Sequence, residues 1–234
     1  MIPWLGDRPA FPPLSRALRE PNGLLAAGGA LTPEWLLAAY RRGIFPWFND
    51  GEPILWWSPS PRMVVFPDEA RISRSLHKTL RRGDYEVRLD HDFPAVIRAC
   101  AAPREPGGRT WITPDIQSAY IRMHQLGYAH SVETYMDGEL AGGLYGMALG
   151  QAFFGESMFS RRTDASKIAF AHLARFLEQH DFRALDCQMT TQHLASLGGR
   201  EIAREDFAKL LNDFASVDPS PARWPEDGAT HPWT

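Results

Sequence analysis

The chain has 234 residues, of which 44% are hydrophobic and 12% aromatic, and this composition excludes a chain that is mainly disordered. Its net charge of −3 excludes a global basic field, so any contact with nucleic acid must come from a local patch. Two cysteines cannot form a disulfide framework, and no segment approaches the ~20 apolar residues that span a bilayer. We therefore expect a cytoplasmic protein without a membrane segment.

The first part of the chain, residues 1–62, is rich in proline, glycine and tryptophan. One helix is predicted there. Thr32 is a good N-cap, Pro33 suits the first helical position, and Gly43 suits the position after the last turn. Tryptophans follow in loops bounded by proline, where simple core packing is less expected. We interpret residues 1–62 as a small N-terminal domain.

From residue 63 the chain alternates between predicted strands and capped helices. Asp137-Gly138 is a strong hairpin turn between two strands. The order, an antiparallel meander followed by helix, strand and helix, predicts an α+β domain with a mixed central sheet over residues 63–216, and residues 217–234 read as a Pro-rich tail. We predict strands over residues 85–90, 130–136, 139–149, 151–159 and 183–189, and helices over residues 73–82, 92–100, 114–127 and 165–180, with a short helix before Gly198-Gly199.

The predicted strand over residues 183–189 carries the first candidate site. Side chains alternate across a strand, so Asp186 and Gln188 should share one face while Leu185, Cys187 and Met189 share the other. If the apolar face is turned to the core, a carboxylate and an amide project together from the end of the strand. A solvated edge is the alternative interpretation.

Glu156 is the second candidate, because alternation places Phe154 and Met158 on its own face. A carboxylate in apolar surroundings needs a cation or hydrogen bonds to compensate its desolvation. Arg161 or Arg162 is the internal partner that the sequence offers, and a cation supplied by a ligand is the functional alternative.

Two segments are candidates for binding phosphate. The helix over residues 73–82 should carry basic side chains on the arc opposite Leu76 and Leu80, without interleaved carboxylates. The start of the long helix, with Ser166 and Lys167 after a capping Asp164, would direct N–H groups, a hydroxyl and an ammonium at an anion. No metal-ligand spacing, GxGxxG motif or Walker loop occurs. The basic set is Arg71, Arg74, Lys78, Arg81 and Arg82.

Several strings together resemble one known family. They are residues 19–25 (REPNGLL), 42–48 (RGIFPWF), 54–59 (ILWWSP), 110–113 (TWIT), 155–161 (GESMFSR), 165–167 (ASK) and 186–188 (DCQ). The chain resembles the bacterial leucyl/phenylalanyl-tRNA–protein transferase family, and the match covers about residues 10–212.

The resemblance implies an enzyme of the N-end rule with a small N-terminal domain and a GNAT-like (acyl-CoA N-acyltransferase-like) C-terminal domain. Such an enzyme transfers leucine or phenylalanine, and less well methionine, from aminoacyl-tRNA to the α-amino group of proteins that begin with Arg or Lys. The product is thereby marked for degradation. The ester is already activated, so the resemblance implies no cofactor and no metal. We expect a monomer.

The resemblance also implies roles for single residues. Asp186 and Gln188 match the catalytic pair of the family, and Glu156 matches the residue that reads the cationic side chain of the acceptor. Trp47 and Trp111 match aromatic platforms for the terminal adenosine. The pocket for the donor side chain is expected at Leu144, Phe153, Met158, Phe170 and Leu173, and the tRNA phosphates at the basic helix and Ser166-Lys167.

Chemistry favours a positioning role for the Asp186 and Gln188 pair. A carboxyl group with a pKa of ~4 is a poor base for an ammonium with a pKa of roughly 8, and an amide is a worse one. Two rival functions stay open. One is a small-molecule N-acyltransferase using an acyl-coenzyme thioester, although the glycine-rich pyrophosphate loop typical of such enzymes is missing before the long helix. The other is a non-catalytic RNA-binding module, which leaves Glu156 without a purpose.

Overall fold

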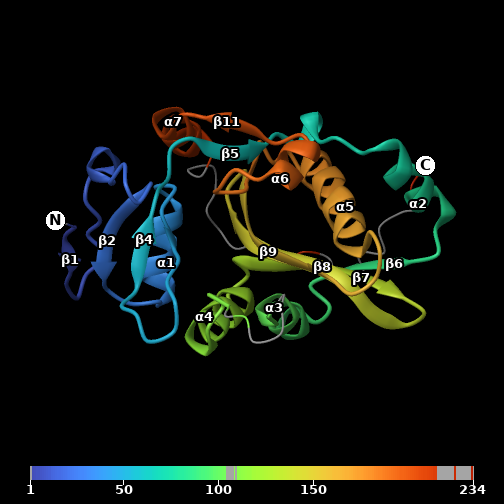
Figure 1. Ribbon diagram of the computed structural model, residues 1–234, viewed down its shortest axis with the longest axis horizontal. Coiled ribbons are helices and arrows are strands. Elements are labelled where there is room, and N and C mark those ends of the chain that lie inside the picture. Colours follow the sequence, from blue (N-terminus) through green and yellow to red (C-terminus); the bar gives the residue numbers. More distant parts are fainter. Residues whose placement is uncertain (1, 104–107, 109, 215–223, 225–232, 234) are drawn as a thin grey trace.

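The computed structural model of the chain describes residues 2–103, 108, 110–214, 224 and 233 (Figure 1). Its N-terminal part is a small four-stranded sheet with one helix against it. The strands are β1 (Trp4–Leu5), β2 (Leu24–Gly28), β3 (Phe45–Pro46) and β4 (Leu55–Trp57), in the order β1-β2-β4-β3. The helix is α1 (Pro33–Tyr40), which begins after Thr32 as predicted from the sequence.

The second sheet has seven strands in the order β11-β5-β10-β9-β8-β7-β6. All neighbours in it run antiparallel except β10 and β9, which are parallel, so the predicted α+β class with a mixed sheet is confirmed. Figure 1 shows helix α5 on one face of this sheet and helices α3 and α4 on the other. The strands are β5 (Arg62–Val65), β6 (Glu86–Leu89), β7 (Ala129–Met136), β8 (Glu139–Leu149), β9 (Ala152–Ser160), β10 (Ala184–Asp186) and β11 (Arg200–Ile202).

Local hydrogen bonds explain where most helices begin and end. The Ser73 hydroxyl accepts from the backbone N–H of Leu76 at the start of α2, and Gly83 ends that helix with a φ of 68°. Asp164 and Thr32 occupy the N-cap positions of α5 and α1 as predicted, but neither caps its helix with its side chain. The remaining elements are η1 (Leu14–Arg16), η2 (Pro67–Glu69), α2 (Arg74–Arg82), α3 (Phe93–Ala101), α4 (Pro114–Gln125), α5 (Ala165–Gln179), α6 (Gln192–Ser196) and α7 (Arg204–Phe214).

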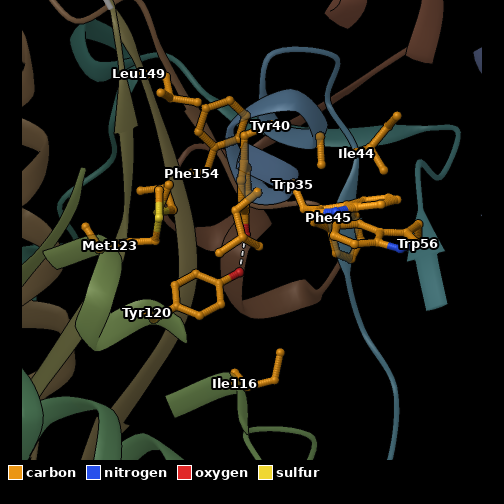
Figure 2. Packing of buried hydrophobic residues seen from close by; sticks show 14 of the residues in the cluster. Trp35, Tyr40, Ile44, Phe45, Trp56, Ile116, Tyr120, Met123, Leu149 and Phe154 are labelled. Carbon is orange, nitrogen blue, oxygen red and sulfur yellow. Dashed lines mark hydrogen bonds between the residues drawn. The ribbon is translucent and has the colours of Figure 1, made fainter. Parts of the chain in front are cut away.

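Two hydrophobic cores lie on the two faces of the large sheet. The first joins the N-terminal sheet to α3, α4 and the C-terminal helix α7, and Figure 2 shows Trp35 and Trp56 packed in it. Their rings stack with centroids 6.0 Å apart, and both are almost completely buried. The second core lies beneath α2 and α5. Because the first core is shared, the N-terminal part and the large sheet pack as neighbours.

Strand β10 is shorter than the sequence predicts. It ends at Asp186, and Gln188 has a φ of 57°, which breaks the alternation that was expected to continue to residue 189. The predicted common face of Asp186 and Gln188 is therefore wrong. The apolar set also separates, since Leu185 is buried whereas Met189 is 50% exposed. Pairing between β9 and β10 stops at Phe154 and Asp186, and the two strands diverge beyond that point.

Strand β9 contains a bulge at Glu156. Ser157 pairs with Tyr145 and Gly155 pairs with Gly146, so Glu156 is an extra residue without a partner on β8. A Cβ atom on Gly146 would lie 2.2 Å from the carbonyl oxygen of Phe154, so only glycine fits opposite the bulge. The extra residue reverses the alternation: Phe154 lies in the first core and Met158 packs against the second. The expectation that both flank Glu156 on one face is wrong.

Only two residues of the expected tail, residues 217–234, are described, and both contact the second core. Trp224 is 5% exposed and stacks on His130 with ring centroids 4.3 Å apart. The rest of the expected tail lies outside the described residues, and the domain boundaries at residues 62 and 216 stay predictions. Among the helices that the structure describes, none is long and apolar enough to cross a membrane.

Candidate functional site

A cavity of about 470 Å³ lies where β9 and β10 diverge. Five parts of the chain enclose it: the β3 region, Trp111, the β8–β9 hairpin, helix α5, and the segment that runs from β10 into α6. Its lining residues are Phe45, Pro46, Trp47, Trp111, Leu144, Tyr145, Gly155, Glu156, Ser157, Met158, Phe170, Leu173, Leu185, Cys187, Gln188, Met189, Thr191, His193 and Leu194. Eight of the ten residues predicted for catalysis, the donor side chain and the adenosine therefore meet in one place, and Asp186 and Phe153 do not.

The aromatic side of the cavity holds Trp47 and Trp111, which are far apart in the sequence. Trp47 is 38% exposed, which is unusual for tryptophan. Trp57 supports it, because the Trp57 indole N–H donates to the carbonyl oxygen of Trp47 at 2.6 Å and the two rings meet edge to face. The partly exposed rings of Trp47 and Trp111 offer a surface on which a planar group can stack.

The apolar end of the cavity lies between the sheet and α5. Four of the five residues predicted for a donor pocket line it, and Leu185 joins them. Phe153 does not line the cavity, because its side chain is fully buried in the second core. The four predicted residues that do line it are Leu144, Met158, Phe170 and Leu173.

Glu156 extends from the bulge between two phenols. The hydroxyl of Tyr40 donates to its Oε1 at 2.6 Å, and the hydroxyl of Tyr120 donates to its Oε2 at 3.1 Å. The two tyrosines also share a hydrogen bond, drawn as a dashed line in Figure 2. Burial raises the pKa of the Glu156 carboxyl to about 7, and hydrogen bonds from the two phenols moderate that rise.

The arginines considered as internal partners of Glu156 lie elsewhere. Arg161 donates to the carbonyl oxygen of Leu140 at 3.1 Å, and Arg162 donates to Asp137 at the same distance. Of the two alternatives for Glu156, the internal partner Arg161 or Arg162 is therefore wrong. Among the residues described along the cavity lining, Glu156 is the single carboxylate and no Lys or Arg is present. This charge distribution suits a ligand that brings its own cation.

Asp186 is closed off from the cavity. Its carboxylate accepts from Arg62 at 2.7 Å (Nε to Oδ1) and 2.6 Å (Nη2 to Oδ2), and both side chains are 1% exposed. The Arg62 guanidinium lies between the rings of Phe45 and Phe207, 5.0 and 4.8 Å from their centroids. A desolvated ion pair of this geometry keeps both charges compensated. Asp186 therefore cannot present its carboxylate to a ligand in the cavity.

Gln188, in contrast, lines the cavity, and Asp186 holds it there. The backbone N–H of Gln188 donates to Asp186 Oδ1 at 3.0 Å, a contact that supports the positive φ of Gln188. The Nε2 of Gln188 lies 3.4 Å from the Asp186 carbonyl oxygen. Of the predicted pair, Gln188 faces the cavity, and Asp186 lies behind it and holds the backbone of Gln188.

Cys187 also lines the cavity but is not poised as a nucleophile. Burial, with the nearby Asp186 charge, raises the pKa of the Cys187 thiol well above its ordinary value, so the group stays protonated. Among the described residues, no three His, Cys, Asp or Glu side chains gather as metal ligands.

The predicted phosphate-binding residues lie outside the cavity. Arg74, Lys78 and Arg81 are exposed on α2, and Arg71 is exposed just before it. Arg82 is also exposed but forms an ion pair with Asp84 at 2.7 Å. At the start of α5 the ammonium of Lys167 donates to Asp164 at 3.0 Å, and the N–H of Ser166 donates to Ser160.

Sequence reasoning missed three residues that decide the chemistry of the site: Tyr40, Tyr120 and Arg62. Tyr40 lies 116 positions from Glu156, and Arg62 lies 124 positions from Asp186. No periodicity or motif spacing in the sequence relates residues that lie so far apart along the chain. The one available signal was the predicted need of Glu156 for a partner, which pointed to the wrong side chains.

Comparisons with known proteins agree on one family. A family model described as leucyl/phenylalanyl-tRNA protein transferase matches residues 64–212, and a model of its N-terminal domain matches residues 29–60. The chain is 70% identical over 224 residues to the leucyl/phenylalanyl-tRNA–protein transferase of Azoarcus sp. (strain BH72), covering 96% of this chain and 95% of that protein. It is 62% identical to the protein of the same name from Aromatoleum aromaticum, with 96% and 94% covered.

Solved structures give more distant likenesses. A structure of L-PGS from Bacillus licheniformis is 13% identical with a TM-score of 0.43, covering 68% of this chain and 52% of that one. A GCN5-related N-acetyltransferase from Kribbella flavida is 12% identical with a TM-score of 0.38, covering 73% and 61%. The assignment to a family rests on the sequence matches.

Proposed function

Because this chain belongs to the leucyl/phenylalanyl-tRNA–protein transferase family, whose members are aminoacyltransferases, we propose that it transfers leucine or phenylalanine, and less well methionine, from aminoacyl-tRNA to protein N-termini. The acceptors in this proposal are proteins that begin with Arg or Lys, and the product is marked for degradation by the N-end rule. The observation that carries the acceptor assignment is the cavity itself, whose lining holds the Glu156 carboxylate and no Lys or Arg among the residues described there.

The donor occupies the two less polar sides of the cavity in this proposal. The aminoacyl side chain enters the apolar end between Leu144, Met158 and Phe170, and the thioether of Met158 can adapt to a branched or an aromatic guest. The terminal adenosine stacks on Trp47 and Trp111, an interaction worth about 1–3 kcal/mol per base. The ester carbonyl then lies between these two sides, toward Gln188.

The acceptor places its cationic side chain on Glu156 and its α-amino group near Gln188. In the reaction the amine nitrogen forms a bond to the ester carbonyl carbon, and the bond from that carbon to the ribose oxygen breaks. The amine loses a proton, and the departing oxygen gains one. Gln188 Nε2 faces Asp186, which leaves Oε1 to accept a hydrogen bond from the amine. We assign Gln188 to orienting the nucleophile, and Asp186 and Arg62 to positioning Gln188.

Phosphates of the tRNA are assigned to the basic side chains before and along α2. Arg71, Arg74, Lys78 and Arg81 are exposed, and among the ion pairs that the structure records none of the four has a carboxylate partner. Lys167 is a weaker member of the proposed surface, because Asp164 already neutralises it. Ser166 stays assigned to the same surface.

One assay separates this function from its rivals. Purified protein is mixed with radiolabelled leucyl-tRNA and a peptide that begins with Arg, and peptide-bound label is measured. Label in the peptide is expected only from an aminoacyl-tRNA transferase. An acyl-coenzyme acyltransferase would label the peptide from the thioester instead, and an RNA-binding module would bind the tRNA without transfer. Absence of transfer from leucyl-tRNA and phenylalanyl-tRNA would overturn the proposal.

The acceptor assignment has its own test. Glu156→Gln keeps the shape of the side chain and removes its charge, so transfer to peptides that begin with Arg or Lys should fall roughly 10- to 100-fold, while leucyl-tRNA binding stays unchanged. The measurements are tRNA affinity and the peptide dependence of transfer at saturating tRNA. A variant with normal peptide dependence would contradict the assignment.

A further inference from the structure

The contacts around Glu156 form a closed ring of oxygen atoms. Tyr40 shares a hydrogen bond with Tyr120, and the two phenols also bond to Glu156, Tyr40 at Oε1 and Tyr120 at Oε2. A hydrogen bond needs one proton between its two oxygens, so the ring needs three protons. Each phenol supplies one.

An ionised Glu156 leaves this ring one proton short. Both phenol protons are then directed at the carboxylate, and the two phenol oxygens face each other with no proton between them. A protonated Glu156 completes the ring: Tyr40 still donates to Oε1, the bond between Oε2 and Tyr120 reverses so that the carboxyl O–H donates, and Tyr120 donates to Tyr40. Every oxygen then has a partner, which matters because an unsatisfied polar contact is costly in a buried site.

No other group near Glu156 supplies the missing proton. Tyr145 of β8 lies nearby, but its buried hydroxyl makes no hydrogen bond to any described residue. His193 of α6 lines the same cavity, but no hydrogen bond recorded among the described residues joins its side chain to the ring. Arg62 of β5 and Asp186 of β10 also act on Glu156, but they are bonded to each other and their charges oppose. Tyr40 and Tyr120 themselves come from α1 and α4 and are fully buried. The carboxyl group is therefore the remaining source.

We propose that Glu156 carries a proton while the acceptor site is empty, that Tyr40 and Tyr120 hold it in this state, and that a cationic acceptor displaces the proton to solvent. The two tyrosines are positioning residues in this scheme. Because the two tyrosines stabilise the protonated acid, acceptor binding requires Glu156 to ionise. The guanidinium or ammonium group of the acceptor approaches, the carboxyl group loses its proton, and an ion pair replaces the closed ring. A neutral side chain leaves the proton in place and gains no ion pair. The displacement step rests on the function proposed above, whereas the protonated empty site does not.

The direction of the pKa shift agrees with the ring. Burial raises the folded-state pKa of Glu156 to about 7 from 4.5. For an acid whose folded pKa is raised, the stabilising contribution is complete below the unfolded pKa and is lost as pH rises toward the folded one. The relevant window is therefore between about pH 4.5 and pH 7, and the protein without acceptor should lose stability through it.

The first experiment uses the protein alone. Glu156→Gln copies the protonated acid, because its amide N–H can donate to Tyr120 and complete the ring. We expect the variant and the wild type to have similar melting temperatures near pH 5, and the variant to become more stable by about 5 °C at pH 8. Glu133→Gln is the matched control. Burial raises the pKa of Glu133 as well, but this carboxylate accepts from Asp92 N, Ser131 Oγ and Tyr135 Oη, so an amide there opposes a donor. Glu133→Gln should therefore melt below the wild type near pH 5, where Glu156→Gln does not.

The second experiment uses wild-type enzyme with leucyl-tRNA and two peptides that begin with arginine or with citrulline, its neutral isostere. Ionisation of the α-amine affects both peptides alike and cancels in the ratio of their kcat/KM values. That ratio should fall by up to about tenfold per pH unit below pH 7, because the proton competes with the cation for Glu156.

The outcomes separate the two proposals. A pH-independent difference in melting temperature between wild type and Glu156→Gln would overturn the protonated empty site, and a pH-independent ratio of kcat/KM would overturn the displacement step. If no peptide receives label at any pH, the proposed transferase function fails, and the melting comparison still decides whether the empty site is protonated.

Discussion

Two carboxylates lie near the point where β9 and β10 diverge, and their surroundings differ in kind. Asp186 ends β10 and is bound on both oxygens by the buried Arg62 guanidinium. Glu156 protrudes from the bulge in β9, is bound by two phenols, and opens on the cavity. The first carboxylate has its cation built into the fold, and the second has none.

This difference distinguishes a positioning role for Asp186 from a ligand-binding role for Glu156, although both residues are plain carboxylates in the sequence. A carboxylate with a permanent cation has no charge left to offer a ligand, so it can only organise its surroundings; here it holds the backbone of Gln188. A carboxylate without a cation is costly to ionise and becomes stable when a ligand supplies the charge. Substitutions can therefore be chosen that alter the surroundings of one carboxylate and leave those of the other intact.

Breaking the ion pair should have the largest effect. Arg62→Met leaves Asp186 buried without its cation, and we expect the free energy of unfolding, measured in urea, to fall by about 3–5 kcal/mol. The double variant Arg62→Met/Asp186→Leu removes both charges and should regain most of that loss. Its transfer activity should stay low, because Gln188 loses the carboxylate that holds its backbone. A loss below about 1 kcal/mol in the single variant would contradict this account.

A side chain added opposite the bulge should have the next largest effect. Gly146→Ala places a Cβ atom against the Phe154 carbonyl oxygen, and we expect a loss of about 2–3 kcal/mol in the free energy of unfolding. Transfer to Arg-starting peptides should fall as Glu156 is displaced. Gly155→Ala is the matched control, since its Cβ atom would meet Leu185 at an ordinary 3.5 Å. Equal losses of stability in the two variants would refute the steric argument.

A change at the apolar end of the cavity leaves both carboxylates in place. Leu144→Phe narrows that end, and overpacking penalises the larger guest first at about 1–3 kcal/mol. Phenylalanine transfer should therefore fall about tenfold or more, and leucine transfer should fall less. Phe153→Leu, which alters a buried residue behind the cavity, should leave the ratio of the two donors unchanged. Equal losses for both donors would place the donor side chain elsewhere.

The smallest effect is expected on α2, away from both carboxylates. Replacing Arg74 and Lys78 with alanine should weaken tRNA binding and reduce the slope of log affinity against log salt by about one unit per lost phosphate contact. Arg98→Ala, an exposed arginine on α3, is the control and should leave the slope unchanged. An unchanged slope in the double variant would contradict the assignment of tRNA phosphates to α2.

Short-range interactions made several elements predictable. The start of α2 at Ser73 and its end at Gly83 depend on hydrogen bonds and backbone preferences within one helical turn. The resemblance supplied the candidate residues as well, and eight of the ten that it places outside the phosphate-binding set line one cavity. The short strands β1–β4 were not predicted, because strands of two to five residues carry little periodic signal.

The prediction failed where one residue changes the register. Alternation assigned Phe154, Glu156 and Met158 to one face, but a period of two cannot reveal a bulge, and the extra residue at Glu156 reverses the faces after it. Asp186 and Gln188 were separated in the same way by the left-handed backbone of Gln188. The bulge directs the Glu156 side chain toward the cavity, and the positive φ of Gln188 does the same for Gln188.

Local sequence patterns were enough to predict the α+β class, several helices and the two carboxylates near the site. Which of the two carboxylates has a cation depended on packing between distant segments. Arg62 reaches Asp186 across 124 positions, and Tyr40 reaches Glu156 across 116. Hydrogen bonds and ion pairs act over a few ångströms in space, whatever the separation along the chain, so the partners of a buried carboxylate become known only when the strands that carry them are packed together.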